Sequence, residues 1–90
     1  MEIRLDQDAE NFLLDLQRST RVIQHRLYND LNDALDHLEL NHAADPACRR
    51  HRYQLPDLGA MFGYVTESSR ESWTVLGRYF EDYLLVHAFV

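Results

Sequence analysis

The sequence predicts an α+β fold with the element order β-α-α-β-β-β, in which two helices pack on one face of a small antiparallel sheet. Two observations carry this prediction. Residues 60–90 contain three short runs rich in Tyr, Phe, Trp and Val, separated by the polar stretches Ser68–Ser72 and Glu81–Asp82. Such runs are typical of consecutive antiparallel strands. Residues 1–40 instead contain one short alternating segment and then two stretches with helical periodicity.

The first strand and the first helix are predicted from residues 1–18. Residues 1–5 alternate apolar and charged side chains, which is the pattern of a half-buried strand. Asp6 follows as a candidate N-cap, and acidic residues in the next turn suit the helix dipole. One face of this helix is predicted to hold four apolar residues: Ala9, Phe12, Leu13 and Leu16. Ser19 and Thr20 interrupt the pattern, and either can cap the next helix.

A longer second helix is predicted from a stripe of apolar residues at helical spacing. The stripe consists of Ile23, Leu27, Leu31, Ala34, Leu35 and Leu38. Acidic residues hold most of the opposite face: Asp30, Asp33, Asp36 and Glu39. Asn41 and the Asp45-Pro46 pair are expected to end the helix. The acidic face fits either a solvated surface or a contact with a basic partner.

The remaining sequence predicts a loop over residues 42–49 and then strands. Residues 50–55 can form a strand that ends at Pro56, and further strands are expected near 60–66, 73–80 and 83–90. In the last strand, Leu84, Val86, Ala88 and Val90 alternate with Tyr83, Leu85, His87 and Phe89. Both sets are mostly apolar. Such a strand is central in a sheet covered on both faces, or one of its faces binds another protein.

Length and composition indicate a single domain spanning residues 1–90 with a modest core. No apolar run approaches the roughly 20 residues needed to span a bilayer. The N-terminal residues lack the basic start and apolar centre of a signal peptide. The lone Cys48 cannot form an internal disulfide, which agrees with a reducing compartment. We therefore expect a cytoplasmic protein with no membrane partner.

Charge is unevenly distributed along the chain. The net charge is -6, which argues against a surface that coats nucleic acid. Residues 1–45 hold ten acidic residues and four arginines, whereas residues 46–90 hold five of each. The first half therefore carries the whole net charge. Within the neutral second half, Arg49, Arg50 and Arg52 cluster around His51.

This basic cluster is the best candidate for chemistry or for anion binding. On a strand, Arg50 and Arg52 would point to one face and His51 to the other. Two guanidinium groups on one face can grip a phosphodiester and stabilise developing charge, so both are candidate catalytic residues, with Arg78 as a third. Arg49 is a candidate binding residue. Alternatively, these arginines pair with the acidic second helix or keep an edge strand from aggregating.

Two further binding residues come from the strands. Tyr79 is one of several strand aromatics that either pack in the core or stack on a nucleobase. His87 lies in the apolar last strand. If a partner buries this side chain in its neutral form, binding would weaken at pH values where histidine becomes protonated. That partner would be a second copy of the chain, a segment of another protein or a target, unless residues 42–49 fold over the face.

Other kinds of site are poorly supported. Cys48 and His51 could act as a nucleophile and its base, but no third orienting group is identifiable. The five histidines are scattered, and there is no glycine-rich phosphate loop, so we expect no metal and no cofactor.

The whole chain resembles the RelE/ParE-type toxins of bacterial type II toxin–antitoxin systems. The resemblance lies in the order of elements and in four segments: Ile3–Phe12, Arg50–Leu55, Trp73–Tyr79 and Tyr83–Phe89. These are similar to the family's opening strand and first helix, its basic strand, its aromatic strand and its final apolar strand. The resemblance implies a cognate antitoxin as partner. It also implies action on translation, by ribosome-dependent mRNA cleavage, or on DNA gyrase.

Three departures bear on which of these activities to expect. The family's aromatic strand usually carries arginine where this chain has Thr74, and ribonuclease members usually place a basic residue or tyrosine beyond the last strand, where this sequence stops at Val90. Family members also tend to be basic. These departures bear less on inhibition of DNA gyrase, which needs no set of catalytic residues. The alternative is a non-enzymatic protein-binding module, or a phage-type inhibitor, that uses the acidic helical surface.

Overall fold

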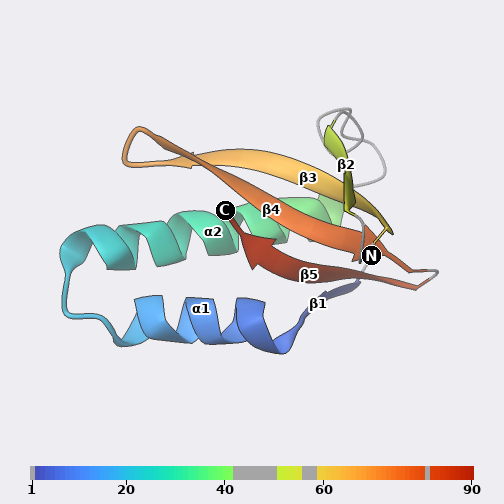
Figure 1. Cartoon of the computed structure of the whole chain (residues 1–90). Coiled ribbons are helices and arrows are strands. Elements are labelled where there is room, and N and C mark those ends of the chain that lie inside the picture. The colour runs from blue at the N-terminus through green and yellow to red at the C-terminus, as the bar shows by residue number, and fades with distance from the viewer. Residues whose placement is uncertain (1, 42–50, 56–58, 81) are drawn as a thin grey trace.

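The computed structural model describes the backbone of residues 2–41, 51–55, 59–80 and 82–90, and the side chains of residues 2–40, 63–78, 80 and 82–90. Seven elements follow one another within these described residues (Figure 1). They are β1 (Glu2–Leu5), α1 (Gln7–Arg18), α2 (Val22–Asn41), β2 (His51–Leu55), β3 (Gly59–Ser68), β4 (Glu71–Tyr79) and β5 (Tyr83–Phe89).

The strands form one five-stranded sheet in the order β1-β5-β4-β3-β2, and both helices lie on the same face of it (Figure 1). This confirms the α+β class with two helices on one face. The sheet differs from the predicted order β-α-α-β-β-β in two respects. In the described part of the chain, four strands follow the helices, because residues 51–55, within the segment that could form a strand, do form one. In addition, β1 pairs with β5 in parallel, whereas the other three pairs are antiparallel. Parallel pairing needs a long connection, which residues 6–82 provide.

The core lies between the helices and the sheet. Its buried side chains are Ala9, Leu13 and Leu16 of α1, Leu31, Ala34, Leu35 and Leu38 of α2, and Val75, Leu84, Val86 and Phe89 of the sheet. The apolar stripes predicted for both helices are therefore confirmed, with one exception. Ile23 is 58% exposed, because the first turn of α2 forms the rim of a pocket instead of packing into the core.

Both ends of α1 are fixed by local hydrogen bonds. Asp6 is the N-cap, as predicted, and its Oδ1 accepts a 3.0 Å bond from the backbone N–H of Ala9. The backbone N–H of Asp6 donates to the carbonyl of Val86, which ties the start of the helix to β5. Ser19 is the C-cap, and its backbone N–H donates a 3.3 Å bond to the carbonyl of Leu16 in the last turn.

A β-bulge in β5 overturns the strict alternation expected for this strand. Val86 pairs with Gly77 and Ala88 pairs with Leu76, which leaves His87 as the extra residue. Beyond this point, the alternate side chains of β5 switch from one face of the sheet to the other. Phe89 consequently joins the core, and Ala88 lies with Leu76 on the other face.

The turn between β3 and β4 is shorter than the predicted Ser68–Ser72 turn. It consists of Ser69 and Arg70, whose φ values are 51° and 69°. Two successive positive φ values characterise the type I′ turn, whose twist matches that of a two-stranded hairpin. The positions favour Asn and Gly, so this turn holds two non-glycine residues in an unfavourable region. Because the turn is only two residues long, β3 and β4 remain paired up to Ser68 and Glu71.

Candidate functional site

The structure places the residues predicted to be catalytic only in part. Arg49 and Arg50 lie outside the described residues. Arg52 lies on β2 in register with Phe62, and Tyr79 lies on β4, but neither side chain is described. Arg78 is half-buried, and its guanidinium carbon lies 5.6 Å from the centroid of the Phe80 ring. A convergence of Arg50, Arg52 and Arg78 therefore stays a prediction.

Arg78 belongs to the sheet face that neither helix covers, which we call the open face. Val75 and its partner Phe89 point into the core, so their neighbours along the strands point away from it. The register then assigns the following described residues to the open face: Glu2, Arg4, Gly63, Val65, Glu67, Ser72, Thr74, Leu76, Arg78, Tyr83, Leu85, Ala88 and Val90. Val65 is 41% exposed and Val90 is 62% exposed. The open face therefore presents aliphatic side chains to solvent.

Cations and aromatic rings meet at the end of the open face where β5 begins. The guanidinium of Arg4 lies 4.0 Å from the ring centroid of Tyr83. Tyr83 stacks on Phe80, with ring centroids 4.8 Å apart and planes 11° apart, and Arg78 lies over Phe80. We call these four residues the cation–aromatic row. Arrangements of this kind are common in protein interfaces, where Arg and Tyr are enriched.

Glu2 neutralises one of the two cations in the row. Both of its carboxylate oxygens accept 3.2 Å hydrogen bonds from Arg4. These bonds, together with the attraction between the two opposite charges, lower the pKa of Glu2 and raise the pKa of Arg4. Within the described residues, no carboxylate lies within ion-pair distance of Arg78. Arg78 is therefore the cation of the row that is more available to a partner.

His87 contacts another residue of the chain. Its Nδ1 lies 2.7 Å from Oδ2 of Asp6, and its Nε2 is buried, with no hydrogen-bond partner among the described residues. A carboxylate that orients an imidazole is a common catalytic arrangement. The burial of Nε2 keeps a substrate from reaching it in this structure. The predicted role of His87 in binding a partner stays a prediction.

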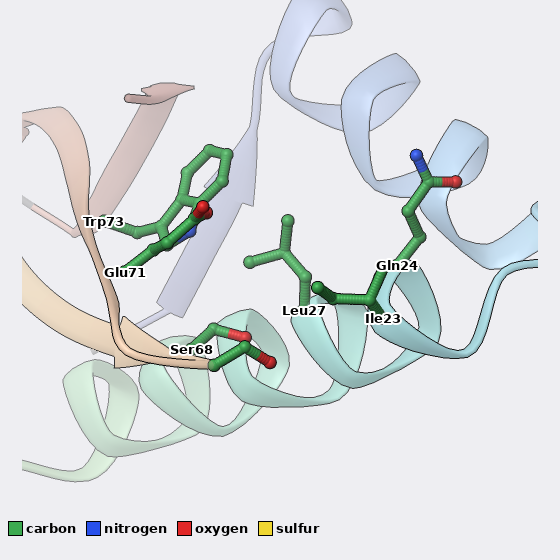
Figure 2. A pocket seen from close by; sticks show the side chains of 7 residues that line it. Ile23, Gln24, Leu27, Ser68, Glu71 and Trp73 are labelled. Atoms are coloured by element: carbon green, nitrogen blue, oxygen red, sulfur yellow. The ribbon is translucent and has the colours of Figure 1, made fainter.

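A pocket on the helix side of the sheet was not anticipated from the sequence. This hairpin pocket has a volume of about 140 Å³. It is lined by Ile23, Gln24 and Leu27 of α2 and by Ser68, Ser69, Glu71 and Trp73 of the β3–β4 hairpin. Figure 2 shows the two groups of side chains facing each other across the pocket. The pocket depends on where the hairpin tip lies relative to α2, and no local pattern encodes that distance.

Comparison of the chain with protein-family models, with curated proteins and with solved structures found no match. In the described part of the chain, no three His, Cys, Asp or Glu residues gather into a group able to hold a metal ion. None of the helices in that part is both long and apolar enough to cross a membrane. The open face and the hairpin pocket are therefore the features from which function is argued.

Proposed function

We propose that this protein is a RelE/ParE-like toxin that acts by binding a protein target and is neutralised by a small antitoxin. The observation that carries the proposal is the open face. Exposed Val65 and Val90 lie on either side of Thr74 in the sheet, and Leu76 and Ala88 lie next to them. An apolar centre beside Arg and Tyr is the composition expected of a protein interface.

The charges of the open face favour a protein target over RNA. Arg4 is already engaged by Glu2, and Arg78 lies over Phe80. Gripping RNA phosphates needs several free cations, and the described part of this face offers only Arg78. Among the activities implied by the resemblance, inhibition of DNA gyrase therefore fits better than cleavage of mRNA on the ribosome. The element order and the helical hairpin on one face support the same resemblance.

The proposal is tested by inducing the chain in a bacterial host, alone and together with the product of a neighbouring gene. We expect growth to slow and the neighbour to restore it. Supercoiling by purified gyrase and translation in a cell extract then separate the two targets. Normal growth despite confirmed accumulation of folded protein, together with no binding of the neighbour's product, would refute the toxin proposal.

A matched pair of variants connects the activity to the open face. Val65→Glu places a charge on the open face, whereas Leu40→Glu makes a similar change on the last turn of α2, where the side chain is 82% exposed. We expect Val65→Glu to abolish growth inhibition and Leu40→Glu to preserve it. Circular dichroism and urea unfolding must show that both variants fold. Equal toxicity of the two variants would separate the activity from this face.

A second candidate function is a non-enzymatic module that binds a basic protein through its helices. The observation that favours it is the exposure of acidic residues on both helices: Asp8, Glu10 and Asp15 on α1, and Asp33 and Asp36 on α2. This candidate predicts salt-sensitive binding to a polybasic peptide. That binding would weaken in the Asp33→Asn, Asp36→Asn double variant, whereas Val65→Glu would leave it unchanged.

A further inference from the structure

The hairpin pocket lies on the helix side of the sheet and has no part in the proposal for the open face. We propose that it binds a tyrosine side chain carried by an acidic segment of a partner protein. Three independent features of the pocket specify this ligand. They are its size and apolar walls, a buried hydroxyl without a partner, and the net positive charge of the two chain segments that form it.

The apolar walls fit one aromatic ring. Leu27 and Trp73 are half-buried and face each other with Ile23 across the pocket (Figure 2). An apolar cavity of about 150 Å³ can hold benzene, and the hairpin pocket has about the same volume. Ile23 continues the apolar stripe of α2 but is left 58% exposed at the rim. A ring seated between these three side chains would remove apolar surface of all of them from water.

Ser68 supplies a hydrogen-bonding group in the lining of the pocket. This residue is only 4% exposed, and within the described residues its Oγ has no hydrogen-bond partner. A buried hydroxyl without a partner destabilises the protein. Ser68 lines the pocket, so a change of its side-chain rotamer would bring Oγ to a ligand seated there, and the resulting hydrogen bond would remove that defect. The phenol group of tyrosine combines an apolar ring with one hydroxyl that can both donate and accept. Tyrosine therefore fits this pocket better than phenylalanine.

The charge of the two segments that form the pocket favours an acidic partner segment, although Glu71 is the one charged residue among the described residues that line the pocket itself. Residues 16–29 contain Arg18, Arg21 and Arg26 and no acidic residue, although the chain as a whole is acidic. The N-terminus of α2, which lies within this stretch, adds its own partial positive charge. The nearby hairpin tip contributes Arg70 together with Glu67 and Glu71, so the two segments together carry +3 and -1, or +2.

A protein segment suits this surface better than a free small molecule does. Val22 is 76% exposed immediately before Ile23, outside the pocket itself. A phenol alone would fill the pocket and leave Val22 and the arginines uncovered. An acidic segment with a central tyrosine would fill the pocket and also cover the exposed residues beside it.

Trp73 makes binding directly measurable, because it is the only tryptophan in the chain and it lines the pocket. The probes are five-residue peptides with blocked ends and a central tyrosine, phenylalanine or alanine flanked by glutamates. A lysine-flanked tyrosine peptide and free p-cresol complete the set. We expect a saturable change of Trp73 emission with the acidic tyrosine peptide. Affinity should fall at least tenfold for the alanine peptide, for the lysine-flanked peptide and for p-cresol.

Paired variants place the binding in the pocket. Ile23→Asp and Leu40→Asp put the same charge at exposed aliphatic positions near opposite ends of α2. Ile23→Asp should weaken the acidic tyrosine peptide at least tenfold, and Leu40→Asp less than twofold. Ser68→Ala should remove the preference for the tyrosine peptide over its phenylalanine counterpart. Val65→Glu on the open face should change none of these values, so the two proposals succeed or fail separately.

Three results would overturn the proposal. The first is no saturable change of Trp73 emission with the acidic tyrosine peptide up to millimolar concentration. The second is p-cresol binding as tightly as that peptide, which would make the pocket a site for small phenols instead of a protein segment. The third is an equal effect of Ile23→Asp and Leu40→Asp, which would move the binding away from the pocket.

Discussion

The imidazole of His87 contacts the carboxylate of Asp6, with Nδ1 2.7 Å from Oδ2, although 81 positions separate the two residues in the sequence. The other carboxylate oxygen of Asp6 caps α1 through the backbone N–H of Ala9. One side chain therefore joins the start of the first helix to the bulge in the last strand. A change at this position affects both elements at once.

Replacement of Asp6 by alanine is expected to destabilise the protein by about 0.5–2 kcal/mol for the lost cap, with a further loss from the broken contact to His87. Asp8→Ala removes an exposed acidic residue from the same turn and serves as the control. Urea unfolding at neutral pH measures the difference. Equal effects of the two substitutions would show that the cap and the contact to His87 contribute little.

Two leucines that lie two positions apart test how the buried face of α2 packs in the core. Leu38 is fully buried and Leu40 is 82% exposed. Leu38→Ala should lower the free energy of unfolding by about 2–5 kcal/mol, because it removes buried methyl groups and leaves a cavity. Leu40→Ala should change it by less than about 0.5 kcal/mol. Similar losses for both would contradict the packing of this helix against the sheet.

The β3–β4 turn offers a stabilising change. Ser69 and Arg70 both have positive φ values, which Asn and Gly adopt at lower cost. The double variant Ser69→Asn, Arg70→Gly should therefore raise the free energy of unfolding by roughly 1 kcal/mol. Thermal and urea unfolding both report this change. A loss of stability would mean that the Ser69 or Arg70 side chain makes contacts that outweigh the relief of backbone strain.

The Glu2–Arg4 pair predicts a local dependence on pH. Hydrogen bonding to Arg4 lowers the pKa of Glu2, so the contribution of this pair to stability is present above the ordinary pKa of Glu2. That contribution is lost as the pH falls through the lowered value. Arg4→Gln should raise the pKa of Glu2 toward its ordinary value, as followed by NMR titration of the Glu2 carboxylate. Arg78→Gln is the control and should leave this pKa unchanged.

The helical half of the fold is largely predictable because its signals are local. The spacing of Ala9, Leu13 and Leu16 defines the buried face of α1, and Asp6 marks where the helix begins. The bulge at His87 has no such local signal in the sequence. Both sets of alternate residues in β5 are mostly apolar, so a change of phase exchanges one apolar side chain for another and the pattern cannot reveal it.

The candidate sites are less predictable because they are assembled from distant segments. Val65, Thr74 and Val90 become neighbours only through strand pairing, and none of them stands out in its own stretch of sequence. The arginine cluster at residues 49–52 attracts attention because it is contiguous. The hairpin pocket combines α2 with a turn more than forty residues later, and its clearest sign, the exposure of Ile23, is visible only in three dimensions.

The parallel pairing of β1 with β5 has a consequence for synthesis on the ribosome. β1 is made first, yet the strand beside it is the last of the seven elements to emerge. Until then the nascent chain holds two amphipathic helices whose core partners in β5, Leu84, Val86 and Phe89, do not yet exist. The helix start at Asp6 also lacks its bonds to Val86 and His87. The native state therefore forms after β5 emerges, and a nascent chain stalled before β5 exposes the apolar faces of both helices to chaperones and proteases.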